Sequence, residues 1–176
     1  MLDNISQKIA LLVKWLTGLI GHITKNNKMN NQAILSDYEF SQTSLRRLKG
    51  VDDRLVILFK YALKRSPIDF GIAYLGGFRT AEEQHELYMA DKSTKDGYLM
   101  KSKHQFGEAV DFIPYVDGKY QLTGKNAERY YLIIIGVIFA CAAQMGIRIR
   151  SGANWDKDEY WVEDQSFIDL PHIELI

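Results

Sequence analysis

The sequence predicts a single α+β domain with a small, mainly antiparallel sheet flanked by helices. The chain has 176 residues, which is close to the usual size of one domain and long enough to bury a sizeable core. Short apolar runs with strand character alternate with longer segments of helical spacing. The sequence contains no repeats or low-complexity segments. This mixture of elements is typical of an α+β architecture, which we assign to residues 31–176.

The segment before this domain, residues 1–30, is expected to form an amphipathic helix followed by a polar linker. Apolar residues recur at helical spacing over residues 5–23. Lys14 interrupts the run, and the ten uncharged residues that follow it are too few for a membrane span, which needs about 20. The segment also lacks the basic start and cleavage site of a signal peptide. The helix therefore docks on its own domain or a partner, or makes a weak contact with a membrane surface.

The first helix of the domain is expected to begin at Ser41 or Ser44, since serine is a favourable N-cap. The helical pattern continues from Val51 to Arg65, with apolar residues at the spacing of one helix face. Pro67 ends it, because proline disfavours the helical conformation of the residue before it. We therefore predict helical structure over most of residues 41–65.

A short strand and a further helix are expected next. The apolar run from Phe70 to Leu75 predicts a strand, which a glycine pair ends. Thr80 is a suitable helix start because Glu82 and Glu83 follow it, near the positive end of the helix dipole. This helix runs to about Ala90.

The second half of the domain holds two more strands and the longest helix. Ala109–Ile113 has the composition of a buried strand, and Asp117-Gly118 signals a turn between two extended pieces. The apolar run from Glu128 to Met145 is long enough to favour a buried core helix over a strand or a membrane segment. Ile147–Arg150 then forms a strand.

Charge and cysteine content exclude several classes of function. Lysine plus arginine equals aspartate plus glutamate at 22 each, so no net field favours nucleic acid or an anionic membrane. We also expect the protein to be a monomer. The one cysteine, Cys141, sits in an apolar run and has no internal disulfide partner. We interpret it as a small buried hydrophobic residue rather than a nucleophile.

Two good metal ligands, His104 and Asp111, lie seven positions apart with Gly107 between them. On one uninterrupted strand this odd separation would put them on opposite faces, so the backbone must turn between them, and Gly107 permits that turn. Ala109 shares a face with Asp111 and leaves room for an ion. A catalytic zinc ion usually has three protein ligands. The segment 169–175 contains the third candidate.

The pattern Ser-x-His-x-x-Gly-x-Ala-x-Asp, followed far downstream by Asp-x-Pro-His-x-Glu-Leu, resembles the zinc cell-wall peptidases of the VanY-like D-alanyl-D-alanine carboxypeptidase family. Within that family it is most similar to phage endolysins that cut the L-alanyl-D-glutamate bond of peptidoglycan. The likeness runs from about Phe40 to the end and includes Gly77-Phe78-Arg79-Thr80, Gln84 and Gly146–Arg150. It implies a fold like that of the hedgehog and D,D-peptidase domains, with a single zinc site.

We expect His104, Asp111 and His172 to hold Zn2+, because two imidazoles and one carboxylate suit zinc and leave a position for water. Asp169, three residues before His172, is the expected general acid and base, and the resemblance implies the same role. Pro171 prevents a helical turn there and brings the chain tightly into the final strand. The competing interpretation is that Asp169 only forms a turn.

Further site residues are expected around the ion. Glu174 shares a strand face with His172 and could orient its imidazole, or could only stabilise strand pairing. Arg79 is the expected anchor for a substrate carboxylate or a polarised carbonyl, because its fork of donors suits that geometry, although a structural ion pair is the alternative. The resemblance implies that Gln84 and Ser102 also line the substrate pocket.

The favoured hypothesis is a zinc endopeptidase that cuts the L-alanyl-D-glutamate bond of the peptidoglycan stem peptide. It would be made in the host bacterial cytoplasm and act at the cell wall or periplasm. The alternatives are a D-alanyl-D-alanine carboxypeptidase and a non-catalytic wall-binding or virion module that retains zinc. Many relatives carry Trp-Gly-Gly-Asp-Trp where this chain has Ser151-Gly152-Ala153-Asn154-Trp155, so we expect Ser151 and Asn154 to change the rim of the cleft.

Overall fold

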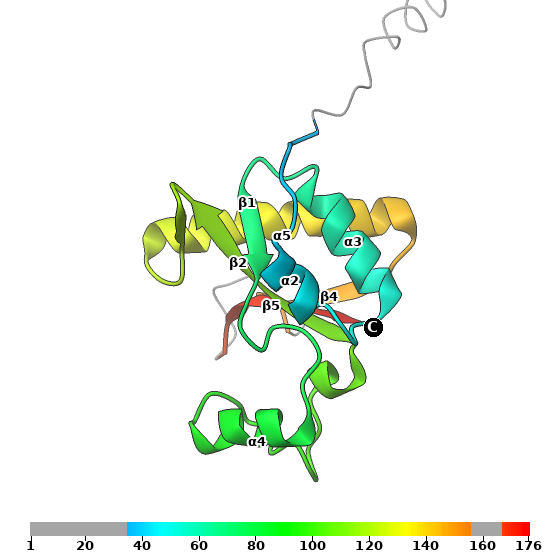
Figure 1. Cartoon of the computed structure of the whole chain (residues 1–176), viewed down its shortest axis with the longest axis vertical. Coiled ribbons are helices and arrows are strands. Elements are labelled where there is room, and N and C mark those ends of the chain that lie inside the picture. The colour runs from blue at the N-terminus through cyan, green and yellow to red at the C-terminus, as the bar shows by residue number, and fades with distance from the viewer. Residues whose placement is uncertain (1–34, 156–166) are drawn as a thin grey trace, which may run out of the picture. The chain divides into compact units, whose positions relative to one another are not determined.

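A computed structural model describes residues 35–155 and 167–176 of the chain (Figure 1). Its elements, in chain order, are α2 (Gln42–Arg47), α3 (Asp53–Leu63), β1 (Asp69–Ile72), α4 (Ala81–Met89), the 3-10 helix η1 (Lys103–Phe106), β2 (Ala109–Val116), β3 (Lys119–Tyr120), α5 (Lys125–Met145), β4 (Ile149–Gly152) and β5 (Asp169–Leu175). The strands form one sheet in the order β1-β2-β5-β4, with β3 paired to β2, and every pairing is antiparallel. The predicted fold class is confirmed.

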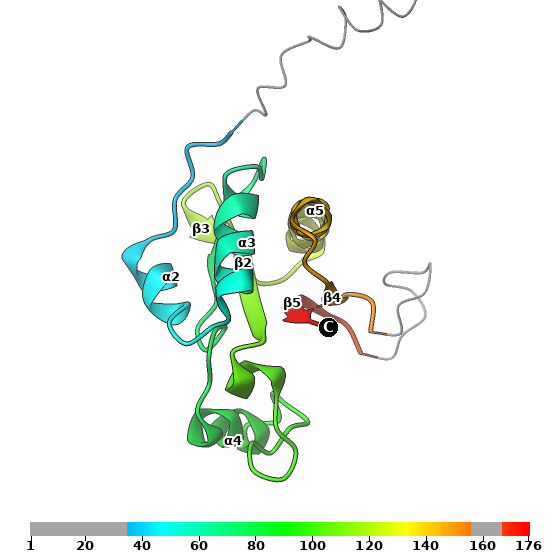
Figure 2. The ribbon, with the colours of Figure 1, turned by 90° about the vertical axis from the view of Figure 1, so that its right-hand side faces the viewer.

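The hydrophobic core lies between the sheet and helices α3 and α5. Phe112 of β2 contacts the rings of Phe59, Phe70 and Tyr131 at centroid distances of 5.3–6.3 Å. Figure 2 shows α5 and α2 on opposite sides of β2. Ser44 of α2 accepts a hydrogen bond from the backbone N–H of Ile72 at 3.2 Å, so α2 is tied directly to β1.

The chain between residues 41 and 65 forms two helices, where the sequence predicted one continuing helical pattern. Ser41 caps α2, as expected, and the helix ends at Arg47. Gly50 has a φ of 82°, and Asp52 then accepts a hydrogen bond from the N–H of Arg54 at 2.9 Å to start α3. This second N-cap satisfies an otherwise unpaired donor and explains the break.

Other predicted elements are confirmed with shifted ends. The Thr80 N-cap is present and forms a reciprocal capping box with Glu83. The Asp117-Gly118 turn joins β2 to β3, with positive φ at both residues. The strand predicted from Phe70 ends at Ile72, before the two glycines. The strand predicted from Ile147 begins two residues later.

Helix α5 is a core helix, as predicted, although it begins at Lys125 rather than Glu128. It is the one helix of the described residues long and apolar enough to cross a membrane. One face nevertheless packs into the core through Tyr131, Ile134, Ile135, Ile138, Cys141 and Ala142. Burial raises the pKa of the Cys141 thiol, which fits a packing role. The predicted helix over residues 5–23 and the boundary at residue 30 lie outside the described residues.

Candidate metal centre

Two of the predicted metal ligands face each other across neighbouring strands. Asp111 of β2 is paired in register with His172 of β5, although 61 positions separate them in the chain. Val110 and Phe112, on either side of Asp111, point to the opposite face and belong to the core. The alternation of side chains along β2 therefore fixes the direction of the carboxylate.

The third predicted ligand, His104, comes from η1, which precedes β2. Ser102 caps this helix by accepting a hydrogen bond from the N–H of His104 at 3.4 Å. Gly107 ends it in the left-handed conformation, with a φ of 70°, and a Cβ at this position would overlap the carbonyl oxygen of Gly50. The predicted turn at Gly107 is confirmed, and it brings His104 back over Asp111.

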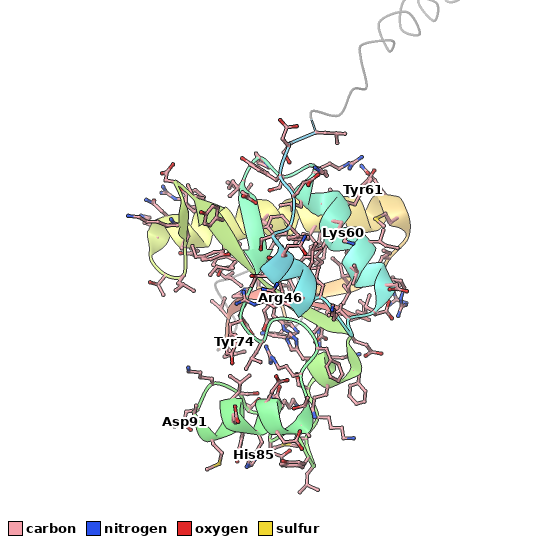
Figure 3. The ribbon with its side chains drawn as sticks, viewed as in Figure 1. Arg46, Lys60, Tyr61, Tyr74, His85 and Asp91 are labelled. Carbon is pink, nitrogen blue, oxygen red and sulfur yellow. The ribbon has the colours of Figure 1, made fainter. Side chains whose placement is uncertain are left out.

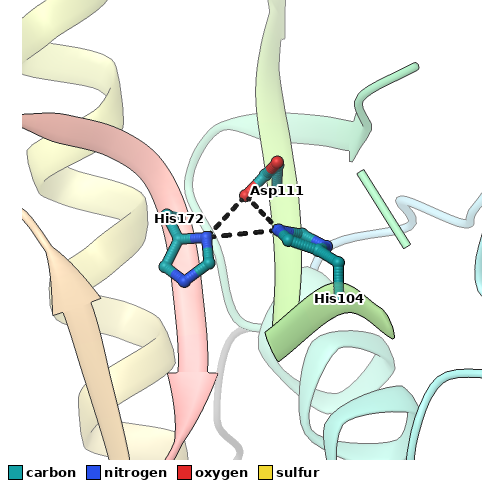
Figure 4. Close-up of side chains that lie close together, drawn as sticks. All are labelled: His104, Asp111 and His172. Atoms are coloured by element: carbon teal, nitrogen blue, oxygen red, sulfur yellow. Dashed lines mark hydrogen bonds and ion pairs between the residues drawn. The ribbon is translucent and has the colours of Figure 1, made fainter. Parts of the chain in front are cut away.

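The three side chains form one compact cluster that could hold a metal ion (Figure 4). Oδ1 of Asp111 lies 2.9 Å from Nδ1 of His172 and 3.2 Å from Nε2 of His104. The two imidazole nitrogens are 3.3 Å apart. All three ligand atoms thus lie within 4.8 Å of one another, and both imidazoles are buried.

The outer nitrogens of both imidazoles face acceptors. Nδ1 of His104 lies 2.8 Å from the carbonyl oxygen of Gly77, and Nε2 of His172 lies 3.1 Å from Oε2 of Glu174. Each outer nitrogen must carry a hydrogen to make these bonds, so in the neutral imidazole each inner nitrogen presents a lone pair to the cluster. Two lone pairs at 3.3 Å beside a carboxylate repel unless a proton or a metal ion lies between them. The donor set therefore fits a metal ion.

Electrostatics at the cluster also favour positive charge. Burial lowers the pKa of His172, but hydrogen bonds to Asp111 and Glu174 outweigh it and raise this pKa to about 9. Burial opposes ionisation of Asp111, yet His104 and His172 hold its pKa well below the usual range. Without a metal ion, a proton supplies the positive charge that these groups stabilise.

Arg79 contacts the cluster from the side of Asp111. Its Nη2 donates to Oδ2 of Asp111, its Nε donates to the carbonyl of Leu75 at 2.5 Å, and its Nη1 donates to Oε1 of Gln84 at 3.3 Å. Gln84 is fully buried and donates in turn to Ser93 and to the carbonyl of Lys95. Three of the five N–H groups of the guanidinium thus bind protein atoms.

Glu174 lies on the other side of His172, on the same strand face, and binds Arg150 of β4 as well. The Arg150 guanidinium sits 5.0 Å from the centre of the Trp155 ring, which itself packs against His172 at 5.2 Å. These contacts surround the imidazole of His172 on its outer side.

Asp169 lies at the start of β5, beside an irregularity in the pairing with β4. The register shifts between Ser151 and Gly152, so Gly152 pairs with Asp169 rather than with His172. Pro171 falls within this irregularity, where its missing N–H costs no ladder bond. Burial raises the pKa of Asp169, and the Asp111 carboxylate adds to this effect. His172, His104 and Arg79 are also close enough to lower it, so Asp169 shares the electrostatic environment of the cluster.

Several contacts around the site were not found from the sequence. The carbonyl of Gly77 is a backbone group, so no side chain signalled it. Arg150 belonged to a block of the resemblance, but its pairing with Glu174 required the sheet register. Ser151 and Asn154, which we expected to change the rim of the cleft, are buried.

The fold and the cluster define a small α+β enzyme domain of the peptidase class. A family model described as phage L-alanyl-D-glutamate peptidase matches residues 36–176, and the chain belongs to this family. The chain is 29% identical over 142 residues to the L-alanyl-D-glutamate peptidase of Escherichia phage T5, covering 79% of this chain and 98% of the relative. It is also similar to the crystal structure of the L-Ala D-Glu endopeptidase ChiX of Serratia marcescens, with a TM-score of 0.63 and 25% identity over 80% of this chain and 92% of ChiX. The resemblance inferred from the sequence is confirmed.

Proposed function

We propose that this peptidase is a zinc enzyme that cuts the L-alanyl-D-glutamate bond of peptidoglycan stem peptides, with His104, Asp111 and His172 as the ligands. The arrangement of the two imidazoles carries the proposal, because both inner lone pairs and a carboxylate oxygen face one point. Two nitrogens and one oxygen in a buried cluster suit zinc better than calcium or magnesium. When bound, zinc supplies a Lewis acid and lowers the pKa of the attacking water.

Asp169 would carry the proton in this reaction. Amide cleavage requires a group that accepts the proton of the attacking water and gives it to the leaving nitrogen. Asp169 is suited to both steps because burial and the neighbouring Asp111 raise its pKa toward the operating pH. The electrostatic effects of Asp111, His172 and His104 on Asp169 support this role, because they act only between groups that are close together.

Arg79 would serve both the metal ligands and the substrate. It fixes Asp111 through one N–H, and two of its N–H groups have no acceptor among the residues that the structure describes. These two donors suit a carboxylate or carbonyl of the stem peptide. Gln84 would hold Arg79 in place, and Ser102 would act through the helix that carries His104 rather than by touching substrate.

Mass spectrometry of digested muropeptides tests the proposal. The purified chain is incubated with peptidoglycan as a zinc-loaded sample, after chelation, and after zinc is restored. We expect release of peptides that begin with D-glutamate, loss of this activity with chelator, and recovery with zinc. Removal of a single terminal D-alanine would identify a D,D-carboxypeptidase instead. A zinc-loaded protein that leaves the wall uncut would be a non-catalytic module.

The proposed activity also sets where the enzyme works. The stem peptide lies in the bacterial wall, so the enzyme would be synthesised in the host cytoplasm and act at the wall or periplasm. Monomeric state and a weak membrane contact through residues 5–23 stay predictions.

A further inference from the structure

A cavity lies outside the metal centre, between the start of α2 and the strands β1, β2 and β3. Its volume is about 310 Å³. Tyr115 and Tyr120 line it, with their rings 5.1 Å apart in an edge-to-face arrangement. Asp69, Ser44 and Gly71 also line it. A Cβ on Gly71 would lie 3.2 Å from Ser44 Oγ and 3.5 Å from the Tyr120 ring, so glycine leaves space between these two lining side chains.

The cavity opens on the same face of the sheet as the metal ligand Asp111. Side chains alternate along β2, so Asp111, Ile113 and Tyr115 share one face. Asp69 is paired with Tyr115 across the β1–β2 ladder, and Tyr120 is paired with Tyr115 across the hairpin. Tyr115 lies four positions after Asp111 on the same strand, which corresponds to about 13 Å.

The lining groups indicate the class of ligand. Glu39 and Asp69 contribute carboxylates, and among the residues that the structure describes no lysine or arginine lines the cavity. An anion would therefore be repelled. Burial raises the pKa of Asp69, which belongs to none of the ion pairs of the described residues. Half-exposed tyrosine rings beside carboxyl and hydroxyl acceptors suit a neutral polyhydroxylated ring, with C–H groups against the rings and O–H groups toward the oxygens.

We propose that this cavity binds an N-acetylated hexosamine of the peptidoglycan glycan strand. The inference rests on the proposed function, because in peptidoglycan the L-alanine of the stem is joined to the glycan through a lactyl group. The lactyl group and one residue, L-alanine, which spans about 3.5 Å, therefore separate the sugar ring from the bond to be cut. A sugar site about 13 Å from Asp111 along the same sheet face is within reach of the first or second ring of the strand. The amidated lactyl group carries no charge, which agrees with the acidic lining.

Steady-state kinetics on two matched substrates test the site. One is the free stem peptide, and the other is the same peptide attached to its disaccharide. We expect the zinc-loaded full chain to cut the second with the higher kcat/KM, through a lower KM. In Tyr115→Ala and in Asp69→Asn, this ratio of kcat/KM values should fall by about fivefold. Tyr61→Ala removes a ring from α3, outside the cavity, and should keep the ratio of the natural sequence.

Equal losses on both substrates would overturn the proposal, since they would indicate misfolding or a cavity that holds part of the peptide. An unchanged ratio in Tyr115→Ala and Asp69→Asn would overturn it as well. Titration of the full chain with tri-N-acetylchitotriose, followed by NMR, is independent of cleavage. Saturable shifts that weaken in Asp69→Asn support the sugar site, and no binding refutes it. Failure of the natural chain to cut either substrate would count against the proposed function, while this titration would still decide the sugar site.

Discussion

Replacement of Glu174 by glutamine should weaken zinc binding without removing a ligand. Glu174 is 4% exposed, and it accepts from Nε2 of His172 at 3.1 Å while it also binds Arg150. Glutamine has nearly the same shape but only one acceptor oxygen and no charge. Either the imidazole or the guanidinium then loses its partner, and the imidazole becomes a weaker and less firmly oriented ligand.

The expected loss of zinc affinity is about 10- to 100-fold, which corresponds to about 1.4–2.8 kcal/mol. The structure places Glu174→Gln toward the upper end of this range, because burial prevents water from replacing the lost acceptor. Arg150→Met removes the other partner of the carboxylate but leaves the bond to His172 intact. We therefore expect a smaller loss of affinity from Arg150→Met than from Glu174→Gln.

The dissociation constant of zinc is measured by competition with a chromophoric chelator, at fixed pH and salt. Glu108→Gln is the matched control, because Glu108 is 37% exposed in its side chain and pairs with Lys103 at 2.6 Å, away from the imidazoles. Its zinc affinity should equal that of the natural chain. If Glu174→Gln also bound zinc with unchanged affinity, Glu174 would only stabilise the pairing of β5, and our account of how His172 is oriented would be wrong.

Three other predictions follow from the same geometry. Asp169→Ala should retain stoichiometric zinc but lose about 10²–10⁴-fold in kcat in the muropeptide assay, and a zinc-loaded variant with full activity would show that another group carries the proton. In the metal-free folded protein the pKa of His172 is about 9, above its unfolded value of about 6.5. The contribution of His172 to the free energy of unfolding is therefore complete below pH 6.5 and is lost as the pH rises through 9. Because zinc must displace this proton, its apparent affinity should rise about tenfold per pH unit up to about pH 9, and a flat titration profile would contradict the assignment. Gly107→Ala should lower the free energy of unfolding by at least about 2 kcal/mol, measured by urea denaturation, because a Cβ there is strained at a φ of 70° and overlaps the Gly50 carbonyl; unchanged stability would mean that this turn is not under strain.

The parts of the fold that the sequence predicted are those with local causes. Val110 and Phe112 alternate with Asp111 in hydrophobicity, so the strand and its buried face follow from period-two patterning. The capping residues Ser41 and Thr80 act on backbone groups within four positions, and both were found. The break at Gly50 was missed because the continuing apolar spacing resembles one helix, and only the packing of Phe78 and Gly107 around Gly50 requires the turn.

The site shows the same division between local and distant causes. His104, Asp111 and His172 belong to sequence motifs and were found from the sequence, and the structure brings their side chains together. Two contacts behind these residues carry no such signal: Gly77 binds His104 only through its backbone carbonyl, and Arg150 reaches Glu174 only through the register of β4 with β5. Arg79 was expected to serve the substrate or to form a structural ion pair, and three of its donors bind protein atoms, one of them Asp111.

The position of the cluster within the sheet couples metal binding to folding. His172 meets Asp111 only when β5 has inserted between β2 and β4, so the unfolded chain offers no preformed site. Once the sheet is formed, two imidazole lone pairs and a buried carboxylate are held close together and repel one another. A bound proton or metal ion removes this electrostatic repulsion. A ligand that binds only the folded chain adds its binding free energy to the stability of that chain. The same three contacts that would activate water therefore also stabilise the central pair of strands, and β2 and β5 should be the elements whose amide exchange slows most when zinc is added.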